Sequence, residues 1–467
     1  MPSMADAALL PPSIISPDDL PRPAISERDL GTLALLRALR TNGLATYSTR
    51  TYTETRLHRR LLGRDFFLLS DPADIDHVLN RHMDRYRRDP LGRRLLEPTV
   101  GRGVLLAEGA EWRRQRYSLA PAFQPRYVDR LIPAFHDAAA RRIVQWDAEG
   151  VQSRNLLIDF RALTLAIAAR AMFSIEDDRR TAELAKLMNE AERQTSFLHW
   201  RDFLFLLLGR DIAQPSVRRA FGERWRGWMV SFLENRPLLA QHEEARDLLD
   251  LLRAARDQGS GGPFQAEVIV DQVGTMMAAG FETTAVALFW IALLLAFFPN
   301  HQEAIRGELC TQSVDAPPEA QFLRSLPITT AFVYEALRLY PPVYNFSRQA
   351  AVDDCIGDCP FRAARRSPYR PGSCTAISAI GSTRTASTLG ASSATAGSSC
   401  PRCGCRSALG RASASAWSSP RQKFSSCCGF CSRATASLCK GRRRSRLVGS
   451  SCCPRSSRAS SSCAFET

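Results

Sequence analysis

Residues 265–298 read QAEVIVDQVGTMMAAGFETTAVALFWIALLLAFF, and this stretch decides the fold. Its apolar residues recur at helical spacing in the first half and cover nearly every side of a helix in the second half. Pro299 follows directly and predicts the end of the helix. Helices in globular proteins usually have only three or four turns. We therefore expect a long helix over 265–298 that crosses the middle of a mainly helical domain.

One turn of this helix, Ala279-Gly280-Phe281-Glu282-Thr283-Thr284, contains residues that disfavour a regular helix. Glycine costs about 1 kcal/mol relative to alanine in a helix interior, and threonine hydroxyls compete for the backbone carbonyls one turn earlier. The hydrogen-bond ladder is therefore expected to open here and to leave a groove beside the helix. The alternative is a helix crossing, in which the small residues allow close packing and Glu282 finds a buried partner.

Two further clusters of polar residues lie on expected helices. Glu335 and Arg338 are three residues apart, so both charges share one helix face, and two prolines at 341–342 stop that helix. Trp112 and Arg116 are one turn apart, and an indole N–H beside a guanidinium suits a bound carboxylate. Taken singly, the first pair also fits a solvated helix face and the second an ordinary basic stripe.

The rest of the chain up to residue 360 predicts further helices and a small sheet near the N-terminus. Phe66–Ser70 and Val104–Leu106 are short apolar runs that fit strands. Helices are expected at 72–80, 126–146, 156–173, 180–196 and 217–233, with a loop at 257–263. The expected fold class is mainly α with a small β-sheet, preceded by an irregular Pro-rich lead-in over 1–30. Residues 31–360 form the expected helical domain.

The last part of the chain, 361–467, differs sharply in composition. It holds 18 basic residues and a single acid, Glu466, whereas residues 1–360 hold 44 basic and 46 acidic residues. The whole net charge of +15 therefore originates in this tail, which also contains 26 serines and 11 of the 14 cysteines. Because its apolar residues have no period and its charges repel one another, we expect the tail to be disordered.

The cysteines and arginines of the tail suggest two binding functions, neither of which the pattern supports well. The run Cys400-Pro401-Arg402-Cys403-Gly404-Cys405 resembles a zinc knuckle, but no second pair or histidine follows at ligand spacing, so we predict no metal ligands. The run Arg442-Arg443-Arg444-Ser445-Arg446 lies among almost no aromatic residues for stacking on bases. Binding to a nucleic acid is therefore not favoured.

The sequence also gives an expectation for location. The first 23 residues lack the basic start and continuous apolar stretch of a signal peptide, and the longest apolar run, Val286–Phe298, is too short to span a bilayer. Residues 1–360 contain only three cysteines, which is typical of a reducing compartment. We expect a cytoplasmic protein without a membrane anchor.

The order and separation of the three polar clusters resemble the cytochrome P450 family of haem-thiolate monooxygenases, in its soluble bacterial form, over about residues 40–360. This resemblance implies the P450 fold, a haem cofactor, and hydroxylation of a small apolar substrate with dioxygen. It also implies an electron-donor ferredoxin or reductase as partner. Haem with a cysteine thiolate ligand favours cleavage of the O–O bond, and the protein positions the substrate and delivers protons.

The same resemblance implies a role for each cluster. The haem propionates would be held by Trp112 and Arg116, and less specifically by Arg348 in Phe346-Ser347-Arg348. Ala279 and Gly280 would line the oxygen groove, and Glu282 and Thr283 would be the catalytic pair that assists protonation of dioxygen. Glu335 and Arg338 would form a structural ion pair behind the haem.

The sequence departs from the family after Arg338, where the cysteine-ligand loop F-x-x-G-x-R-x-C-x-G is missing. Read one base out of register, the codons of Cys403–Trp417 can encode RLPFGAGPRVCIGL, which contains this loop. Ser367–Thr385 can encode SISPWVLHRHQRYWEHPD in the same frame, which resembles the segment before it. We infer a one-base shift near residues 361–367. The hidden cysteine codon would straddle Ser413 and Ala414, so neither residue can supply a thiolate.

Two hypotheses follow. The first is a cytochrome P450 by descent whose haem-ligand region is disrupted, so that the chain as written is impaired or inactive. The second is a non-enzymatic helical protein whose basic tail binds RNA or an acidic partner.

Overall fold

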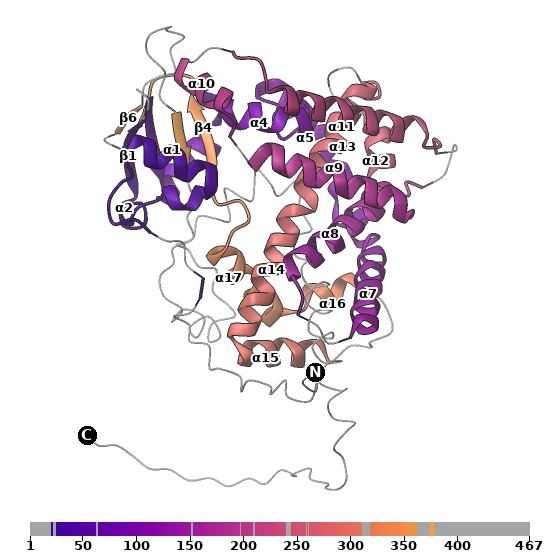
Figure 1. Cartoon of the computed structure of the whole chain (residues 1–467). Helices are drawn as coiled ribbons and strands as arrows, with labels where there is room; N and C mark the ends of the chain where they lie inside the picture. Colours follow the sequence, from indigo (N-terminus) through magenta and orange to yellow (C-terminus); the bar gives the residue numbers. More distant parts are fainter. Residues whose placement is uncertain are drawn as a thin grey trace, which may run out of the picture.

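Helices dominate the part of the chain that the structure describes, which confirms the expected mainly α fold class. The structure is a computed structural model, and it describes residues 20–21, 25–61, 64–150, 153–196, 198–208, 211–239, 244–257, 259, 261–310, 318–357, 359–361 and 374–377. Most of the expected lead-in over 1–30 and nearly all of the tail lie outside these residues. In Figure 1 the sheet lies to the left and most of the helices to the right.

The strands form one mixed sheet and one separate hairpin. The sheet has the order β1-β2-β7-β4-β3 and is built from β1 (Arg56–Leu61), β2 (Arg64–Leu69), β3 (Tyr86–Arg88), β4 (Phe346–Ala350) and β7 (Cys374–Ile377). The hairpin consists of β5 (Asp354–Ile356) and β6 (Cys359–Phe361). The strand predicted at Phe66–Ser70 is confirmed as β2, and the sheet joins segments from both ends of the described chain.

The strand β7 corrects part of our expectation for the tail. We predicted disorder throughout 361–467, but β7 lies inside this segment and pairs parallel to β2 and antiparallel to β4. Two neighbouring strands offer unpaired backbone N–H and C=O groups, and any extended segment can satisfy these groups whatever its hydrophobic period. The prediction for 362–373 and 378–467 falls on residues outside the described part.

The strand predicted at Val104–Leu106 is wrong, because these residues form turns. Gly103 comes so close to the central helix that a Cβ atom at this position would lie 2.6 Å from the backbone oxygen of Asp271. The backbone N–H of Val104 donates to Gln272 Oε1 at 3.1 Å. The segment is therefore held against a helix rather than beside another strand.

The helices follow the predicted pattern closely; Leu156–Phe173, for example, has the predicted bounds. They are α1 (Thr32–Thr41), α2 (Thr49–Thr53), α3 (Pro72–Asp76), α4 (Pro90–Val100), α5 (Gly109–Leu119), α6 (Pro125–Asp129), α7 (Ile132–Glu149), α8 (Leu156–Phe173), α9 (Asp178–Ser196), α10 (Trp200–Leu208), α11 (Ser216–Glu234), α12 (Leu248–Ala254), α13 (Ala266–Gly280), α14 (Glu282–Phe297), α15 (Pro299–Leu309), α16 (Ala320–Arg324) and α17 (Pro327–Leu339). Short 3₁₀ or π turns are η2 (Gly43–Thr46), η3 (His77–Arg81), η4 (Met83–Arg85) and η5 (Ala120–Phe123).

The long helix predicted over 265–298 is present as α13 and α14, which are separated by a break at Phe281. Thr283 Oγ1 donates to the backbone oxygen of Ala279 at 2.7 Å, and Thr284 Oγ1 donates to that of Gly280 at 3.0 Å. The hydroxyls thus bond to carbonyls one turn earlier, as expected, and the opened ladder is confirmed.

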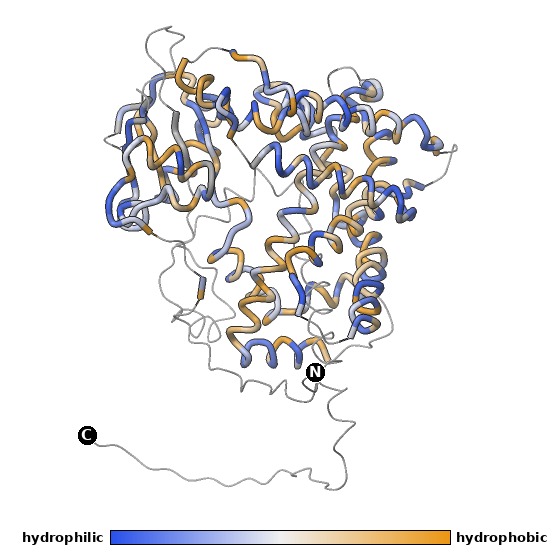
Figure 2. The backbone as a smooth tube through the Cα atoms, in the orientation of Figure 1, coloured by the Kyte–Doolittle hydropathy of each residue, from blue (hydrophilic) through white to orange (hydrophobic). Residues whose placement is uncertain are grey.

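The helix α14 forms the centre of a large apolar core. It packs against α8 on one side and α17 on another, and Ala285, Leu288 and Ile291 are almost fully buried there. Figure 2 shows α14 as predominantly hydrophobic, whereas α7 alternates between hydrophobic and hydrophilic residues. Residues 266–297 are long and apolar enough to cross a membrane by length and composition alone, and half of the most apolar window is buried inside this fold.

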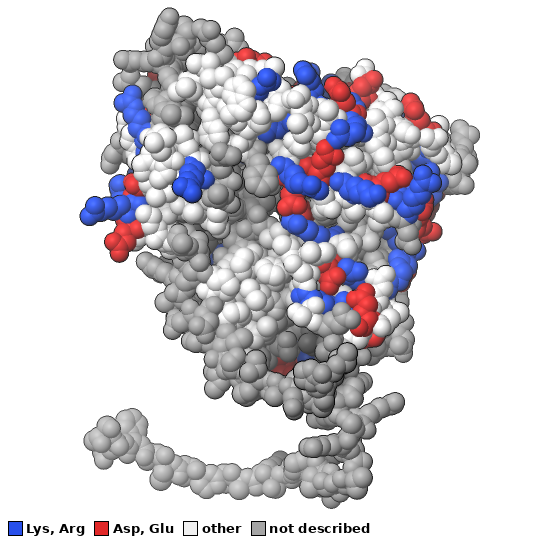
Figure 3. Space-filling view, in the orientation of Figure 1, with Lys and Arg blue, Asp and Glu red and all other residues white. Residues whose placement is uncertain are grey.

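The surface of the described residues carries both signs of charge. On the face seen in Figure 3, basic and acidic side chains are interspersed over the helices. This agrees with the nearly equal numbers of basic and acidic residues in 1–360.

Candidate functional site

The opened turn between α13 and α14 brings together the predicted catalytic pair. Glu282 is the first residue of α14 and Thr283 follows it. Arg161 on α8 donates to Glu282 Oε1 through Nη2 at 2.6 Å and through Nε at 3.1 Å. The two alternatives from the sequence are therefore both realised, because the ladder opens and Glu282 also has a partly buried cationic partner. Sequence analysis did not identify Arg161, since its partner is 121 residues away.

The carboxyl group of Glu282 is in an unusual environment. Its Oε2 atom is buried and has no hydrogen-bond partner among the described residues. Burial raises the pKa of Glu282 above its ordinary value, although the hydrogen bonds and charge of Arg161 act in the opposite direction. A carboxyl group with a raised pKa can hold and release a proton closer to neutral pH than an ordinary glutamate.

The small residues of this turn serve helix packing as well. A Cβ atom at Gly280 would lie 3.1 Å from Met172 Cε on α8, so glycine permits the close approach of α13 to α8. Ala279 is half-buried, and its backbone oxygen accepts the Thr283 hydroxyl. Their part in an oxygen groove stays a prediction.

The predicted carboxylate-binding pair lies on α5. The guanidinium carbon of Arg116 is 5.2 Å from the centroid of the Trp112 ring, so the two side chains are adjacent, as their spacing predicted. Burial lowers the pKa of Arg116, because the charged form is partly removed from water. The pair thus offers a partly desolvated positive charge beside an indole.

A pair of buried amides joins α5 to the central helix. Gln272 on α13 donates through Nε2 to Gln115 Oε1 at 2.8 Å, and Gln115 in turn donates to the backbone oxygen of Arg102 at 3.1 Å. Gln115 lies between Trp112 and Arg116 on the same helix. The amide pair therefore fixes the predicted carboxylate site relative to α13, and sequence analysis gave no signal for it.

Arg348 has a second arginine as its neighbour. It lies on β4 directly opposite Arg88 of β3 in the antiparallel register. Burial and the nearby charge of Arg348 lower the pKa of Arg88 to about 10, and burial also lowers the pKa of Arg348. The negative charge of Glu108 acts in the opposite direction on both, but burial outweighs it. Neither guanidinium forms a salt bridge within the described part of the chain. Two like charges held together in this way favour binding of an anion.

Arg88 was missed because cross-strand pairing is not visible in the sequence. Its Nε donates to the backbone oxygen of Ala107 at 3.3 Å, and its backbone N–H donates to Glu108 Oε1. Glu108 is also 3.1 Å from Arg93 Nη2 and directly precedes α5. These bonds hold the beginning of α5 against β3, so that both predicted carboxylate sites lie on connected elements.

The predicted ion pair on α17 is present. Arg338 donates to both carboxylate oxygens of Glu335, with Nη2–Oε1 at 2.7 Å and Nε–Oε2 at 2.8 Å. Both side chains are largely buried, and α17 packs against α14. Trp290 of α14 also stacks on Tyr340 with 4.0 Å between ring centroids. The three predicted clusters are thus connected through α13 and α14: the first lies at the break between these helices, the pair on α5 is linked to α13 by the Gln115–Gln272 bond, and α17 packs on α14.

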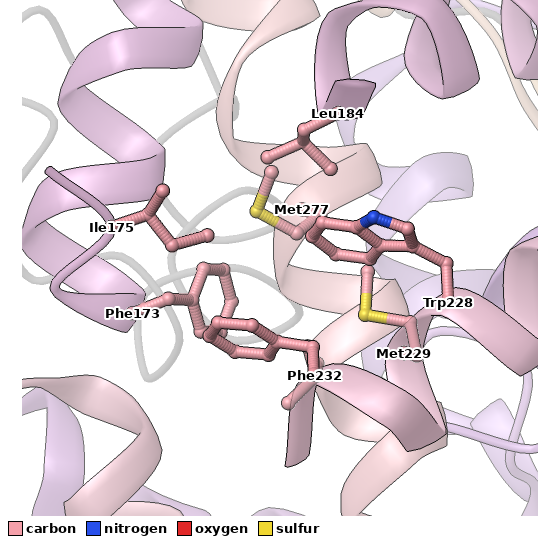
Figure 4. Close-up of a pocket in the computed structure, with 8 residues that line it drawn as sticks. Phe173, Ile175, Leu184, Trp228, Met229, Phe232 and Met277 are labelled. Carbon is pink, nitrogen blue, oxygen red and sulfur yellow. The ribbon is translucent and has the colours of Figure 1, made fainter. Parts of the chain in front are cut away.

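A cluster of apolar side chains packs beside this helix. Its members are Phe173, Ile175, Leu184, Trp228, Met229, Phe232, Val273 and Met277, and the gap between them is too small to hold a water molecule. Figure 4 shows these side chains converging from several helices. Binding sites for drug-sized ligands usually enclose about 300–1,000 Å³, so this cluster is part of the packed core rather than a cofactor site.

Comparison with known proteins identifies the family. The sequence model of the family described as "Cytochrome P450" matches residues 46–364. The chain belongs to the cytochrome P450 family. Members of this family are haem-dependent monooxygenases that use dioxygen, an organic substrate and a redox partner. The P450 match ends close to the residue where the composition of the chain changes.

Curated relatives and solved structures agree with this assignment. The chain is 26% identical to Protein LUTEIN DEFICIENT 5, chloroplastic, of Arabidopsis thaliana, over 64% of this chain and 52% of that protein. It is 26% identical to Cytochrome P450 4Z1 of Homo sapiens, over 61% of this chain and 58% of that protein. The aligned part thus spans little more than half the length of these two relatives.

Two solved P450 structures have the same fold. One is the retinoic acid bound cyanobacterial CYP120A1, with a TM-score of 0.58 at 20% identity over 76% of this chain and 77% of that chain. The other is a cytochrome P450, CYP102L1, with a TM-score of 0.60 at 18% identity over 81% of this chain and 84% of that chain. These likenesses confirm the P450 fold that the three clusters implied.

The described residues include donors of the kind that could hold haem carboxylates. Arg88, Arg348 and the Trp112–Arg116 pair are donors suited to carboxylates such as the haem propionates. The described residues do not show the cysteine ligand to iron. Cys310 and Cys355 are exposed, and Cys355 Sγ donates to the backbone oxygen of Gly357. The P450 ligand loop and the codons at Ser413 and Ala414 fall outside the described part.

Proposed function

We propose that this chain derives from a haem-dependent monooxygenase that hydroxylates a small apolar substrate with dioxygen. The observation that supports this most directly is the open turn at Phe281, with Glu282 and Thr283 at its edge. When bound through a cysteine thiolate, haem supplies the activation of dioxygen. The chain's own task is to bind the haem carboxylates, to shape the substrate site and to supply protons.

The proposed roles of the residues follow from their contacts. Trp112, Arg116 and Arg348 bind propionates, and Arg88 adds a second guanidinium beside Arg348. Glu282 holds a proton on its buried carboxyl group, and the Thr283 hydroxyl lies next to it in the chain. Glu335 and Arg338 stabilise α17 and take no part in the chemistry.

The proposal includes an impaired state of the chain as written. The family match ends at residue 364, and the basic, Ser-rich and Cys-rich composition begins at about residue 361. A one-base shift between 361 and 367 accounts for both. Contacts between arginines and propionates do not replace an iron–sulfur bond, so we expect little or no monooxygenase activity.

The proposal extends to partners and location. An electron-donor ferredoxin or reductase is required because dioxygen activation consumes two electrons. A cytoplasmic site of action is supported by the low cysteine content of residues 1–360. A nucleic acid and a membrane anchor are not part of the proposal.

The test compares the chain as written with a version in which one base restores the frame after residue 361. The reduced, carbon monoxide-bound form of the restored chain should give the absorption band of thiolate-ligated haem, and the chain as written should not. A restored chain whose ligand-loop cysteine is replaced by serine is the matched control and should also lack the band. A thiolate band from the chain as written would contradict the proposed frame shift.

A further inference from the structure

Three charged side chains from three helices meet at the break between α13 and α14. Arg161 lies on α8, Glu192 on α9 and Glu282 at the start of α14, and α8 contacts both of the other helices (Figure 1). Arg161 Nη2 is 2.6 Å from Glu192 Oε1 and also 2.6 Å from Glu282 Oε1. One guanidinium nitrogen is therefore shared between two carboxyl groups.

The two carboxyl oxygens of Glu282 differ in their hydrogen bonds. Both hydrogen bonds from Arg161 end on Oε1, whereas Oε2 is buried without a partner among the described residues. A guanidinium has no proton acceptor, so Oε1 is held as a hydrogen-bond acceptor. A proton on this carboxyl group therefore belongs on Oε2.

The charges of the cluster do not balance. With both glutamates ionised, two negative charges face one positive charge, and among the described residues Arg161 and Glu192 are the charged groups that act on Glu282. The Glu192 side chain is the most exposed of the three, at 36%, compared with 25% for Glu282. The excess negative charge disfavours simultaneous ionisation of both carboxyl groups.

We propose that Arg161 is a positioning residue that fixes Oε1 of Glu282 and leaves Oε2 as the proton-carrying oxygen, and that Glu192 controls this by sharing the guanidinium. When Glu192 is ionised, its negative charge partly neutralises Arg161, and Glu282 retains its proton more readily. When Glu192 is neutral, the positive charge of Arg161 stabilises only the carboxylate of Glu282, and Glu282 releases its proton more readily. Glu192 thus adjusts proton supply at the break from a position near the protein surface.

This inference deepens the proposed function, since proton supply matters only to a catalytic site. Its test, however, needs no haem. The protonated carboxyl group of Glu282 is followed by infrared difference spectroscopy of the full chain over a pH range, with E282Q used to assign its C=O band. The E192Q variant should lower the titration midpoint and the R161Q variant should raise it, each by about tenfold in the proton-binding constant.

Two neighbouring ion pairs provide matched controls. E190Q removes a carboxylate two residues from Glu192 that pairs with Arg224 instead. R142Q breaks the pair with Asp159, which joins α7 to α8 and does not involve Arg161. Both variants should leave the Glu282 midpoint unchanged. R161K retains the positive charge with one ammonium group and should give a midpoint between those of the wild type and R161Q; it replaces R161Q if that variant does not fold.

An unchanged midpoint in E192Q, or an unchanged or lowered midpoint in R161Q or R161K, would overturn the inference. The frame-restored chain separates this outcome from failure of the proposed function. If the restored chain shows thiolate-ligated haem but the midpoints do not move, only the inference fails. If the midpoints move but no thiolate band forms, only the proposed function fails.

Discussion

Gly274 lies where α13 crosses α4, and a Cβ atom there would be only 2.6 Å from the backbone oxygen of Thr99. This oxygen is also held by a hydrogen bond of 2.6 Å from Trp225 Nε1. Because a fixed backbone cannot move aside as a flexible side chain can, we expect G274A to lower the free energy of unfolding by about 1–3 kcal/mol. Urea denaturation measures this as a lower midpoint at constant slope.

The control for this prediction is Gly227, which lies inside α11 with no atom within 4 Å of the corresponding Cβ position. The change G227A should raise the free energy of unfolding by about 0.5–1 kcal/mol, because alanine favours a helix interior. Equal effects of the two substitutions would show that the contact at Thr99 does not limit the approach of α13 to α4.

At the scale of elements, a buried cluster joins three helices around Asp202. The side chain of Asp202 on α10 is fully buried; Arg94 on α4 bonds to it at 2.8 Å, and Arg218 on α11 bonds to it at 3.0 Å. Burial raises the pKa of Asp202, but the hydrogen bonds from Arg218 and Arg94 outweigh this effect, so that the pKa is lowered. The carboxylate therefore holds α10 between α4 and α11.

The change D202N leaves two buried guanidinium groups without a carboxylate. We expect it to lower the free energy of unfolding by about 3–5 kcal/mol at neutral pH. The wild-type contribution should be complete above the ordinary aspartate pKa of about 3.9 and should decline at lower pH, since the folded-state pKa is depressed. Thermal unfolding of both proteins between pH 7 and pH 3 measures the difference, which should shrink as the pH falls.

The ion pair of Asp129 with Arg324, in which the arginine is exposed and the aspartate half-buried, serves as the comparison. D129N should change the free energy of unfolding by less than about 1 kcal/mol, because water reaches both charges of this pair. A similar loss in D129N and D202N would contradict the special role assigned to the buried cluster.

Sequence analysis predicted those elements whose causes are local. The break at Phe281 follows from Gly280 and the two threonine hydroxyls, and the pair of Glu335 with Arg338 follows from their spacing. The partners Arg161, Arg88 and Gln272 were missed because tertiary packing brings them to the site. The strand prediction at 104–106 was wrong for the same reason, because tertiary contact with α13 determines the conformation of this segment.

For the molecule as a whole, the sheet region depends on links between distant parts of the chain. Asp354 of β5 accepts hydrogen bonds from His77 Nε2 at 3.0 Å and from Tyr86 O–H at 2.9 Å, and Arg85 Nη1 is 3.2 Å from its other oxygen. These partners are about 270 residues earlier in the sequence. Burial raises the pKa of Asp354. The hydrogen bonds from His77, the Cys355 backbone and Tyr86 outweigh this effect and lower the pKa to about 2.

The change D354N should therefore remove a pH-dependent part of the stability of the whole fold. A carboxylate whose folded-state pKa is about 2 contributes fully above pH 4 and loses its contribution as the pH falls towards 2, which amounts to about 2 kcal/mol. Unfolding curves from pH 7 to pH 2 should show a steeper acid loss in the wild type than in D354N. D65N, which removes the exposed partner of His58, should retain the wild-type slope. An acid loss of equal slope in D354N and the wild type would mean that Asp354 does not hold the hairpin to the N-terminal half of the sheet.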